Sequence, residues 1–171
     1  VIHAGLGDTQ VGALTDAARP RINSVCEQLA LSGRPLTACE DILTPLWQKL
    51  AINAGINPFT ALLNCANGAL SGHPLFEAKI QAVCRETAQV MCATRPACGN
   101  PERCAADLEA RARGVIQRTA ANISSMLQDV RAGRPTEIDA INGYIVQRGL
   151  ALGIQTPTNQ WLCESVKGLS H

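Results

Sequence analysis

The chain changes character near residue 40, and this change limits the folds that are open to it. Residues 1–39 contain a short apolar segment, a helix expected from Thr15 to about Leu31, and a second extended segment that reaches Ala38. One strand–helix–strand unit cannot cover both faces of a sheet, so these residues are expected to be the tail of a larger α/β domain. From Glu40 onward the signals are helical.

Residues 40–171 are predicted to form a helical bundle, so the fold class is mainly α with a βαβ remnant in front. In the first helix, apolar residues recur at a spacing near 3.6, which indicates one buried stripe; they are Ile42, Leu43, Leu46, Trp47, Leu50 and Ala54. Pro58 lacks a backbone N–H and disfavours the α conformation at Asn57. The helix is therefore expected to end near Asn57, with a kink or a restart there.

Four more helices follow from the pattern of apolar and capping residues. One is predicted from Pro74 to about Ala93, and a longer one over 102–130. Thr136 is placed to cap the next helix, with Asp139 as the acidic partner of a capping-box-like start. A last helix is expected after Pro157.

Composition excludes several classes of function. Fifteen Lys and Arg against 14 Asp and Glu give a net charge of +1, which leaves no basic stripe for nucleic acid. The longest uncharged stretch, 50–76, contains asparagines, prolines and a histidine, so it is not expected to span a membrane. The chain shows no secretion signal, and the eight cysteines are irregularly spaced. We therefore expect a cytoplasmic protein with reduced, mostly buried thiols.

A polar face on the first helix is the first candidate site. Lys49, Asn53 and Asn57 stand at i, i+4 and i+8, so they share one face. Only three lysines occur in the chain, and a lysine, unlike an arginine, can lose a proton. Beside two amides, Lys49 is a credible proton donor. The alternative is a solvated lysine with two helix-end asparagines.

A second candidate cluster lies on the predicted long helix, where Asn122, Ser125 and Asp129 are expected to share a face. The third candidate is Glu137, in the first turn of the following helix. The helix dipole favours a carboxylate there, so a helix-start acid without chemistry is the alternative for Glu137.

These clusters sit inside longer strings that resemble the ketopantoate reductase (2-dehydropantoate 2-reductase) family. Residues 46–61, LWQKLAINAGINPFTA, resemble the family's helix in which a Trp precedes the catalytic Lys and an Asn-Pro pair closes the run. Residues 122–129, NISSMLQD, followed by GRPTEID at 133–139 and ING at 141–143, resemble a second signature. TPTN at 156–159 also matches, so the resemblance covers nearly the whole chain.

The resemblance implies NADPH-dependent reduction of 2-dehydropantoate (ketopantoate) to (R)-pantoate, a step of pantothenate and coenzyme A biosynthesis. By the same resemblance, Lys49 would be the general acid that protonates the carbonyl oxygen and stabilises the alkoxide. Glu137 would contact the substrate and orient Lys49. Substrate hydroxyl and carboxylate groups would be held by Asn53, Asn57 and Ser125, with Asn122 a weaker candidate.

The sequence departs from the family at its start, because the G-x-G-x-x-G turn that cradles a dinucleotide is absent. We therefore expect 1–39 to be the end of the nucleotide-binding Rossmann domain. Residues 40–171 would be the helical domain, similar to the C-terminal domain of 6-phosphogluconate dehydrogenase. NADPH would be bound mainly by the missing part, and this chain alone is expected to be inactive. The incomplete α/β unit also makes a homodimer an expectation.

Two alternatives stay open at this point. The chain could belong to a paralogue that reduces a different 2-oxo acid, because a fold does not fix a substrate. It could also be a noncatalytic domain that only dimerises or binds a ligand.

The segment 92–104 is unusual for the family, because it brings Cys92, Cys98 and Cys104 within one loop region. A zinc site needs a fourth ligand and more closely spaced pairs, so no metal is expected and a plain connection between helices is the default. A disulfide between Cys98 and Cys104 has no functional warrant at this level.

Overall fold

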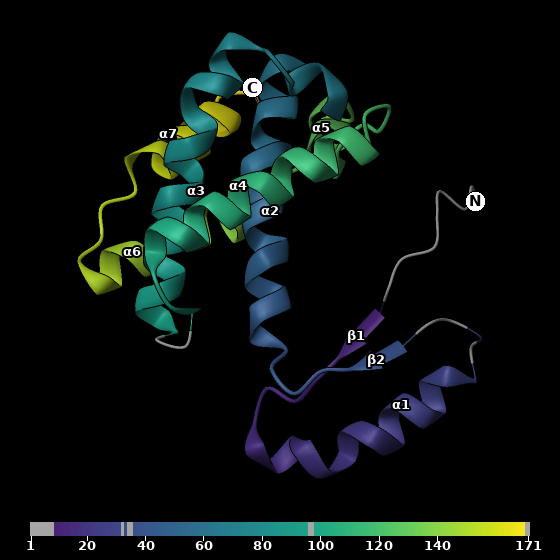
Figure 1. Cartoon of the computed structure of the whole chain (residues 1–171). Helices are drawn as coiled ribbons and strands as arrows, with labels where there is room; N and C mark the ends of the chain where they lie inside the picture. Colours follow the sequence, from purple (N-terminus) through teal and green to yellow (C-terminus); the bar gives the residue numbers. More distant parts are fainter. Residues whose placement is uncertain (1–8, 32, 34–35, 96–97, 170–171) are drawn as a thin grey trace. The chain divides into compact units, whose positions relative to one another are not determined.

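The computed structural model describes residues 9–31, 33, 36–95 and 98–169. The chain divides into two compact units, residues 1–47 and 48–171. The smaller unit is a short α/β element, and the larger one consists of helices (Figure 1).

The described part of the smaller unit has the predicted order of strand, helix and strand. Strands β1 (Thr9–Val11) and β2 (Leu36–Ala38) pair in parallel, and the helical segment connects them. The single helix expected from Thr15 is instead a 3-10 turn, η1 (Asp16–Arg21), followed by α1 (Ile22–Ala30). Pro20 lies inside the turn, where its missing N–H removes an α-helical bond. The apolar segment expected at residues 1–8 lies outside the described residues.

The long helix α2 (Leu43–Leu63) begins in the smaller unit and continues into the larger one. Its predicted apolar stripe is only partly buried: Trp47 and Ala54 are buried, whereas Leu43 and Leu46 are 42% and 48% exposed. The exposed positions belong to the smaller unit, whose helices η1 and α1 contain no buried residue. The described residues of that unit therefore offer no core to cover them.

The predicted end of this helix near Asn57 is wrong, because α2 runs through Pro58 as one continuous helix to Leu63. Proline cannot donate to the carbonyl four residues earlier, which is that of Ala54. The side-chain Nδ2 of Asn142 donates to this Ala54 oxygen at 3.2 Å instead. A distant side chain thus replaces the backbone donor that Pro58 lacks, and the helix continues.

Six further helical segments complete the larger unit among the described residues. They are η2 (Asn67–Leu70), α3 (Pro74–Thr94), α4 (Pro101–Arg118), α5 (Ser125–Arg131), α6 (Ile138–Leu152) and α7 (Pro157–Lys167). The helices predicted at 74–93 and after Pro157 are confirmed. Helix α3 packs against α4, α6 and α7. None of the helices in the described part of the chain combines the length and apolar character needed to cross a bilayer.

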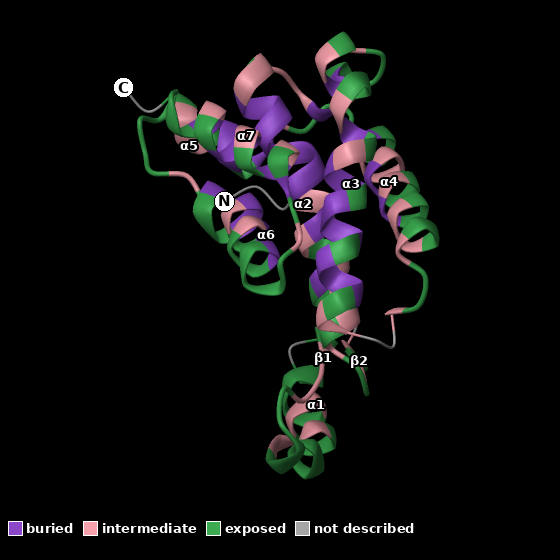
Figure 2. Cartoon of the chain, turned by 90° about the vertical axis from the view of Figure 1, so that its left-hand side faces the viewer, coloured by how far each residue is buried: buried purple, intermediate pink, exposed green. Residues whose placement is uncertain are grey.

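The core of this unit forms where α2 and α3 face each other, and Figure 2 shows buried residues along both helices. Phe59 and Phe76 are fully buried there and meet edge to face, with ring centroids 5.3 Å apart. Fully burying such a ring stabilises the fold by about 2–3 kcal/mol. The core therefore lies directly behind the Asn57–Thr60 turn of α2.

The single helix predicted over 102–130 is also wrong, because α4 ends at Arg118 and α5 begins at Ser125. Carbonyl groups in the connection bond elsewhere: Asn67 N–H donates to Asn122 at 3.0 Å and Gly68 N–H to Ala120 at 2.9 Å. A Cβ at Gly68 would lie 2.7 Å from that of Ala120, so only glycine permits this approach. Long-range backbone bonds therefore replace the helical ones.

An ion pair joins α3 to α4 and gives stability a defined pH dependence. The Arg113 guanidinium, which donates to both carboxylate oxygens of Glu77, holds the pKa of that carboxyl below its usual range. The pKa of Glu77 is lower in the folded than in the unfolded state. The stabilisation by the ion pair is therefore fully present above the ordinary pKa of glutamate, and it is lost as the pH falls through the folded pKa.

We expect Glu77→Gln to lower the free energy of unfolding by about 0.5 kcal/mol at pH 7, a value typical of exposed pairs. Urea titrations from pH 7 to 3 would measure this change. The difference in unfolding free energy between Glu77→Gln and the unsubstituted chain should vanish below the folded pKa of Glu77. The exposed Glu27 is a control position, and Glu27→Gln should leave the free energy of unfolding at pH 7 unchanged. A Glu77→Gln deficit that persists unchanged at pH 3 would contradict the assignment.

Candidate functional site

The polar face predicted on the first helix is present on α2. Because α2 is a continuous α-helix over 43–63, Lys49, Asn53 and Asn57 lie along one side of it. Lys49 is exposed, Asn53 is half-buried, and Asn57 is only 9% exposed. Burial therefore increases along the face, from the solvated ammonium group of Lys49 to the Asn57 amide at the edge of the core.

The inner end of this face is joined to the start of α5. The Thr60 hydroxyl donates to the Asn57 carbonyl at 2.8 Å, and its Oγ1 lies 2.6 Å from Oγ of the buried Ser124. The same Ser124 oxygen accepts the N–H of Leu127 at 3.1 Å and so caps α5. One serine therefore caps this helix and fixes it against α2.

The structure separates the members of the second predicted cluster. Asn122 lies in the connection before α5, whereas Ser125 is the first residue of α5, so the two do not share a helical face as predicted. Both side chains are exposed. Because the preceding Ser124 is bonded to Thr60, Ser125 is placed next to the part of α2 that carries Asn57. Asp129, on α5, pairs with Arg134 at 2.8 Å.

Glu137 is the N-cap of α6 and not a first-turn residue, and its exposed side chain makes no capping bond. Thr136 was predicted as the cap, but its hydroxyl accepts only a long bond, 3.4 Å, from the N–H of Ile138. Among the described residues, no hydrogen bond or ion pair joins Glu137 to Lys49 or Asn53. The predicted pairing of Glu137 with Lys49 is thus not made in this structure.

A buried polar chain fixes α6 and α7 against α2, and sequence reasoning missed it. The Glu86 carboxylate on α3 accepts the backbone N–H groups of Thr158 and Asn159 and the Asn159 side-chain amide, at 2.7–2.9 Å. Asn142 Nδ2 on α6 donates to Asn159 Oδ1 and to the Ala54 carbonyl. This series of hydrogen bonds ends at the Ala54 carbonyl, one residue beyond Asn53. It therefore holds the middle of the polar face in place.

Two buried amide oxygens in this region have no hydrogen-bond partner among the described residues, Oδ1 of Asn67 and Oδ1 of Asn142. The Asn67 amide itself donates to Thr119 Oγ1 at 2.8 Å. A buried acceptor without a partner is uncommon in proteins. The Asn67-Gly68 pair is the local signal that could have drawn attention to this turn.

One surface pocket lies nearby but is separate from the predicted residues. It is formed by the end of α5, the loop before α6 and the end of α7, and its lining includes Arg131, Arg134, Thr136, Asp139 and Lys167. None of the six predicted site residues lines it. Two of its cations are in ion pairs, since Lys167 contacts Asp139 at 2.6 Å and Arg134 contacts Asp129, whereas Arg131 donates to the Asn64 side chain at 2.9 Å.

The double role of Ser124 gives a stability prediction. We expect Ser124→Ala to lower the free energy of unfolding by about 2 kcal/mol, since it removes a helix cap and a buried hydrogen bond. Urea denaturation would measure the change. The neighbouring exposed Ser125 supplies the control, because Ser125→Ala should stay within about 0.5 kcal/mol of the unsubstituted chain. Equal losses in the two variants would mean that Ser124 does not fasten α5 to α2.

The family described as ketopantoate reductase PanE/ApbA C terminal matches residues 41–170. The chain belongs to the ketopantoate reductase family. The match contains all six predicted site residues and every helix of the larger unit.

Relatives of the ketopantoate reductase family extend this match to the smaller unit. The 2-dehydropantoate 2-reductase of Vibrio cholerae serotype O1 is 43% identical over 172 residues, which cover 99% of this chain and 55% of the relative. The probable 2-dehydropantoate 2-reductase of Bacillus subtilis has a structure 34% identical to this chain, with a TM-score of 0.80, over 98% of this chain and 54% of that one. The chain thus spans about half the length of these relatives.

The fold is shared more widely than the family name. D-mandelate dehydrogenase, in a ternary structure with NADH and anilino(oxo)acetate, matches with a TM-score of 0.87 at 22% identity, over 97% of this chain and 67% of that one. At this identity the similarity concerns the fold alone. The fold is therefore not confined to proteins named ketopantoate reductase.

Proposed function

We propose that this chain is the substrate-binding, C-terminal part of an NADPH-dependent 2-dehydropantoate 2-reductase, which reduces ketopantoate to (R)-pantoate. The observation that carries the proposal is the polar face of α2, where Lys49, Asn53 and Asn57 lie in a row inside the family match. Residues 1–39 would be the end of the nucleotide-binding domain and 40–171 the substrate domain.

Lys49 has the chemistry and the position of a proton donor. Its ammonium group is exposed at the outer end of the face, so a bound carbonyl oxygen can reach it. As that oxygen gains negative charge during reduction, Lys49 would donate a proton to it and stabilise the charge until the proton has transferred. The cation also attracts the carboxylate of a 2-oxo acid.

The amides and hydroxyls suit the remaining groups of ketopantoate. Asn53 and Asn57 each offer two N–H donors and one acceptor, which can bind a carboxylate and a hydroxyl group. Ser125, placed beside them through the Ser124–Thr60 contact, adds a hydroxyl. Asn122 is a weaker candidate, because it lies in the connection and not on α5. Glu137 would orient Lys49 only after a movement that joins them.

The nucleotide is assigned to residues outside this chain. The G-x-G-x-x-G turn that would cradle a pyrophosphate is absent from the sequence, and the described part of the smaller unit has two strands and one α-helix. These residues do not fit a dinucleotide site. When bound elsewhere in the whole protein, NADPH would supply the hydride; the residues of this chain would bind the substrate and supply the proton.

We also propose a cytoplasmic location and a homodimer for the whole protein. A reducing compartment suits a chain whose eight cysteines are all free thiols. The uncovered leucines of the smaller unit, Leu14, Leu29 and Leu31, are surface that further parts of an α/β domain or a second copy would cover.

Calorimetric titration of ketopantoate into this chain, without nucleotide, tests the substrate site. We expect weak binding that Asn57→Ala and Lys49→Ala each reduce at least tenfold. Lys79→Ala is the matched control, since Lys79 is on α3 and lies over the Trp161 ring, 4.3 Å from its centroid. Equal binding by Lys49→Ala and Lys79→Ala would sink the site assignment.

The fold shared with D-mandelate dehydrogenase favours a second candidate, a reductase of another 2-oxo acid. Anilino(oxo)acetate, titrated under the same conditions, separates the two. Ketopantoate should bind more tightly if the proposal is right, because its hydroxyl group can pair with the amides of the face. Tighter binding of anilino(oxo)acetate would favour the second candidate. A chain that binds neither compound would favour a noncatalytic role.

A further inference from the structure

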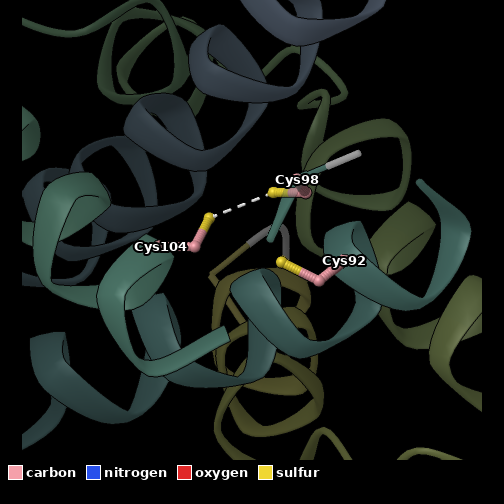
Figure 3. Close-up of side chains that lie close together, drawn as sticks. All are labelled: Cys92, Cys98 and Cys104. Atoms are coloured by element: carbon pink, nitrogen blue, oxygen red, sulfur yellow. Dashed lines mark hydrogen bonds between the residues drawn. The ribbon is translucent and has the colours of Figure 1, made fainter. Parts of the chain in front are cut away.

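Three cysteines that the substrate site does not use converge where α3 joins α4. Cys92 is in the last turn of α3, Cys104 is in the first turns of α4, and Cys98 lies in the connection between them. Their sulfur atoms all lie within 4.8 Å of one another, and Figure 3 shows the side chains directed toward a common point. The sequence placed the three thiols in one loop region, but their spacing argued against a metal site there.

The backbone around the cluster holds this arrangement. Gly99 has a φ of +84°, which reverses the chain after Cys98 at a conformation that favours glycine. Asn100 then caps α4 through its side chain, which accepts the N–H of Arg103 at 2.9 Å. Its carbonyl accepts the N–H of Cys104 at 3.0 Å. The turn and the cap together direct Cys98 and Cys104 to the same side.

The spacing of the sulfur atoms suits a metal ion. Three thiolates in a plane around one ion, with metal–sulfur bonds of about 2.3 Å, would lie about 4.0 Å apart. Here Sγ of Cys98 and Cys104 are 3.5 Å apart, and all three pairs are within 4.8 Å. Adjustments of less than about 1 Å would therefore complete a trigonal site.

The donor atoms select a soft ion. All three ligands are sulfur, and the thioether of Met91 lies 4.0 Å from Cys104 Sγ, in reach as a weak fourth donor. The group found among the described residues includes no histidine or carboxylate. Thiolate ligands suit both Cu(I) and zinc, but zinc in structural sites usually takes four nitrogen, sulfur or oxygen ligands. Three thiolates with a weak thioether therefore favour Cu(I). An open depression beside Cys92, also lined by Gln89 and Gly99, offers an entry path.

We propose that Cys92, Cys98 and Cys104 form a binding site for a single Cu(I) ion. Each S–H bond that gives way to a copper–sulfur bond releases one proton to solvent, and the copper keeps its oxidation state. The bound ion would link the end of α3 to the start of α4. The site is independent of the proposed reductase activity.

Competition with a chromophoric chelator tests the site. The reduced chain, under argon, would be titrated against the Cu(I) complex of bicinchoninate, with Cu(I) supplied as its acetonitrile complex. We expect the chain to withdraw one equivalent of copper. Cys98→Ser, a change in the connecting loop, should weaken binding at least tenfold. Cys65→Ser replaces a half-buried cysteine outside the cluster and should leave binding unchanged.

Two further measurements keep the test decisive. X-ray absorption of the loaded chain should show sulfur neighbours only, and Cu(I) should raise the thermal unfolding midpoint of the unsubstituted chain and not that of Cys98→Ser. Equal copper uptake by Cys98→Ser and the unsubstituted chain would overturn the proposal. So would a fully reduced chain that withdraws no copper, or one that binds Zn(II) through added oxygen or nitrogen ligands in preference to Cu(I).

Discussion

Replacing Lys49 by alanine is expected to lower kcat by about 10³-fold, within the range for loss of a positioned general acid. The chain spans 55% of the Vibrio cholerae relative, so the assay would use this chain joined to the N-terminal part of that relative. NADPH oxidation with ketopantoate would be followed by absorbance. Because the ammonium group is exposed on α2, its removal should leave the unfolding free energy within about 0.5 kcal/mol.

Two variants separate the roles of Lys49. Lys49→Arg keeps the positive charge but cannot readily lose a proton, so it should restore substrate binding more than kcat. Lys79→Ala, at a lysine stacked on Trp161, should keep full activity. A Lys49→Ala enzyme within fivefold of Lys79→Ala would show that another group supplies the proton.

Replacing Asn142 by leucine is expected to destabilise the chain by about 2–4 kcal/mol. Asn142 is fully buried, and its amide donates to two acceptors, the Ala54 carbonyl and Asn159 Oδ1. Each buried acceptor left without a donor costs about 1–3 kcal/mol. Urea denaturation, followed by circular dichroism, would measure the loss. Ketopantoate binding should weaken as well, because Ala54 follows Asn53 in the helix.

The cause assigned to this loss can be tested by a second substitution. Pro58→Ala restores a backbone N–H that can donate to the Ala54 carbonyl within α2. We therefore expect the unfolding free energy of the Asn142→Leu/Pro58→Ala double variant to exceed, by about 1 kcal/mol, the value obtained by adding the effects of the two single substitutions. Strict additivity would mean that Asn142 does not compensate for the proline. Asn122→Leu, at an exposed amide, is the control for the asparagine change itself.

Those parts of the fold that depend on local sequence could be predicted. Helix α3 begins at Pro74 and α7 at Pro157, and in both the proline occupies a first-turn position that needs no backbone donor. The i, i+4, i+8 spacing of Lys49, Asn53 and Asn57 is likewise a property of one helix. The strand–helix–strand order was also visible, because it requires only short segments of different character.

The parts that could not be predicted depend on contacts between residues far apart in the sequence. Pro58 indicated the end of a helix, but Asn142 supplies the missing donor from α6. The break after Arg118 depends on backbone bonds to Asn67 and Gly68. Ser124, which joins the two signature segments, does so through Thr60, 64 residues earlier. No local pattern in either segment encodes these pairs.

The hydrogen bond from Asn142 to Ala54 also has a consequence for the order in which the protein opens. Its partners are 88 residues apart. The Ala54 carbonyl, which Pro58 leaves without a backbone donor, therefore has its hydrogen bond only while α6 is in place. Transient detachment of α6 should therefore loosen the middle of α2 as well, and the two helices should behave as one cooperative unit. In native-state hydrogen exchange, amides of α2 beside Pro58 and those of α6 should exchange with the same free energy of opening.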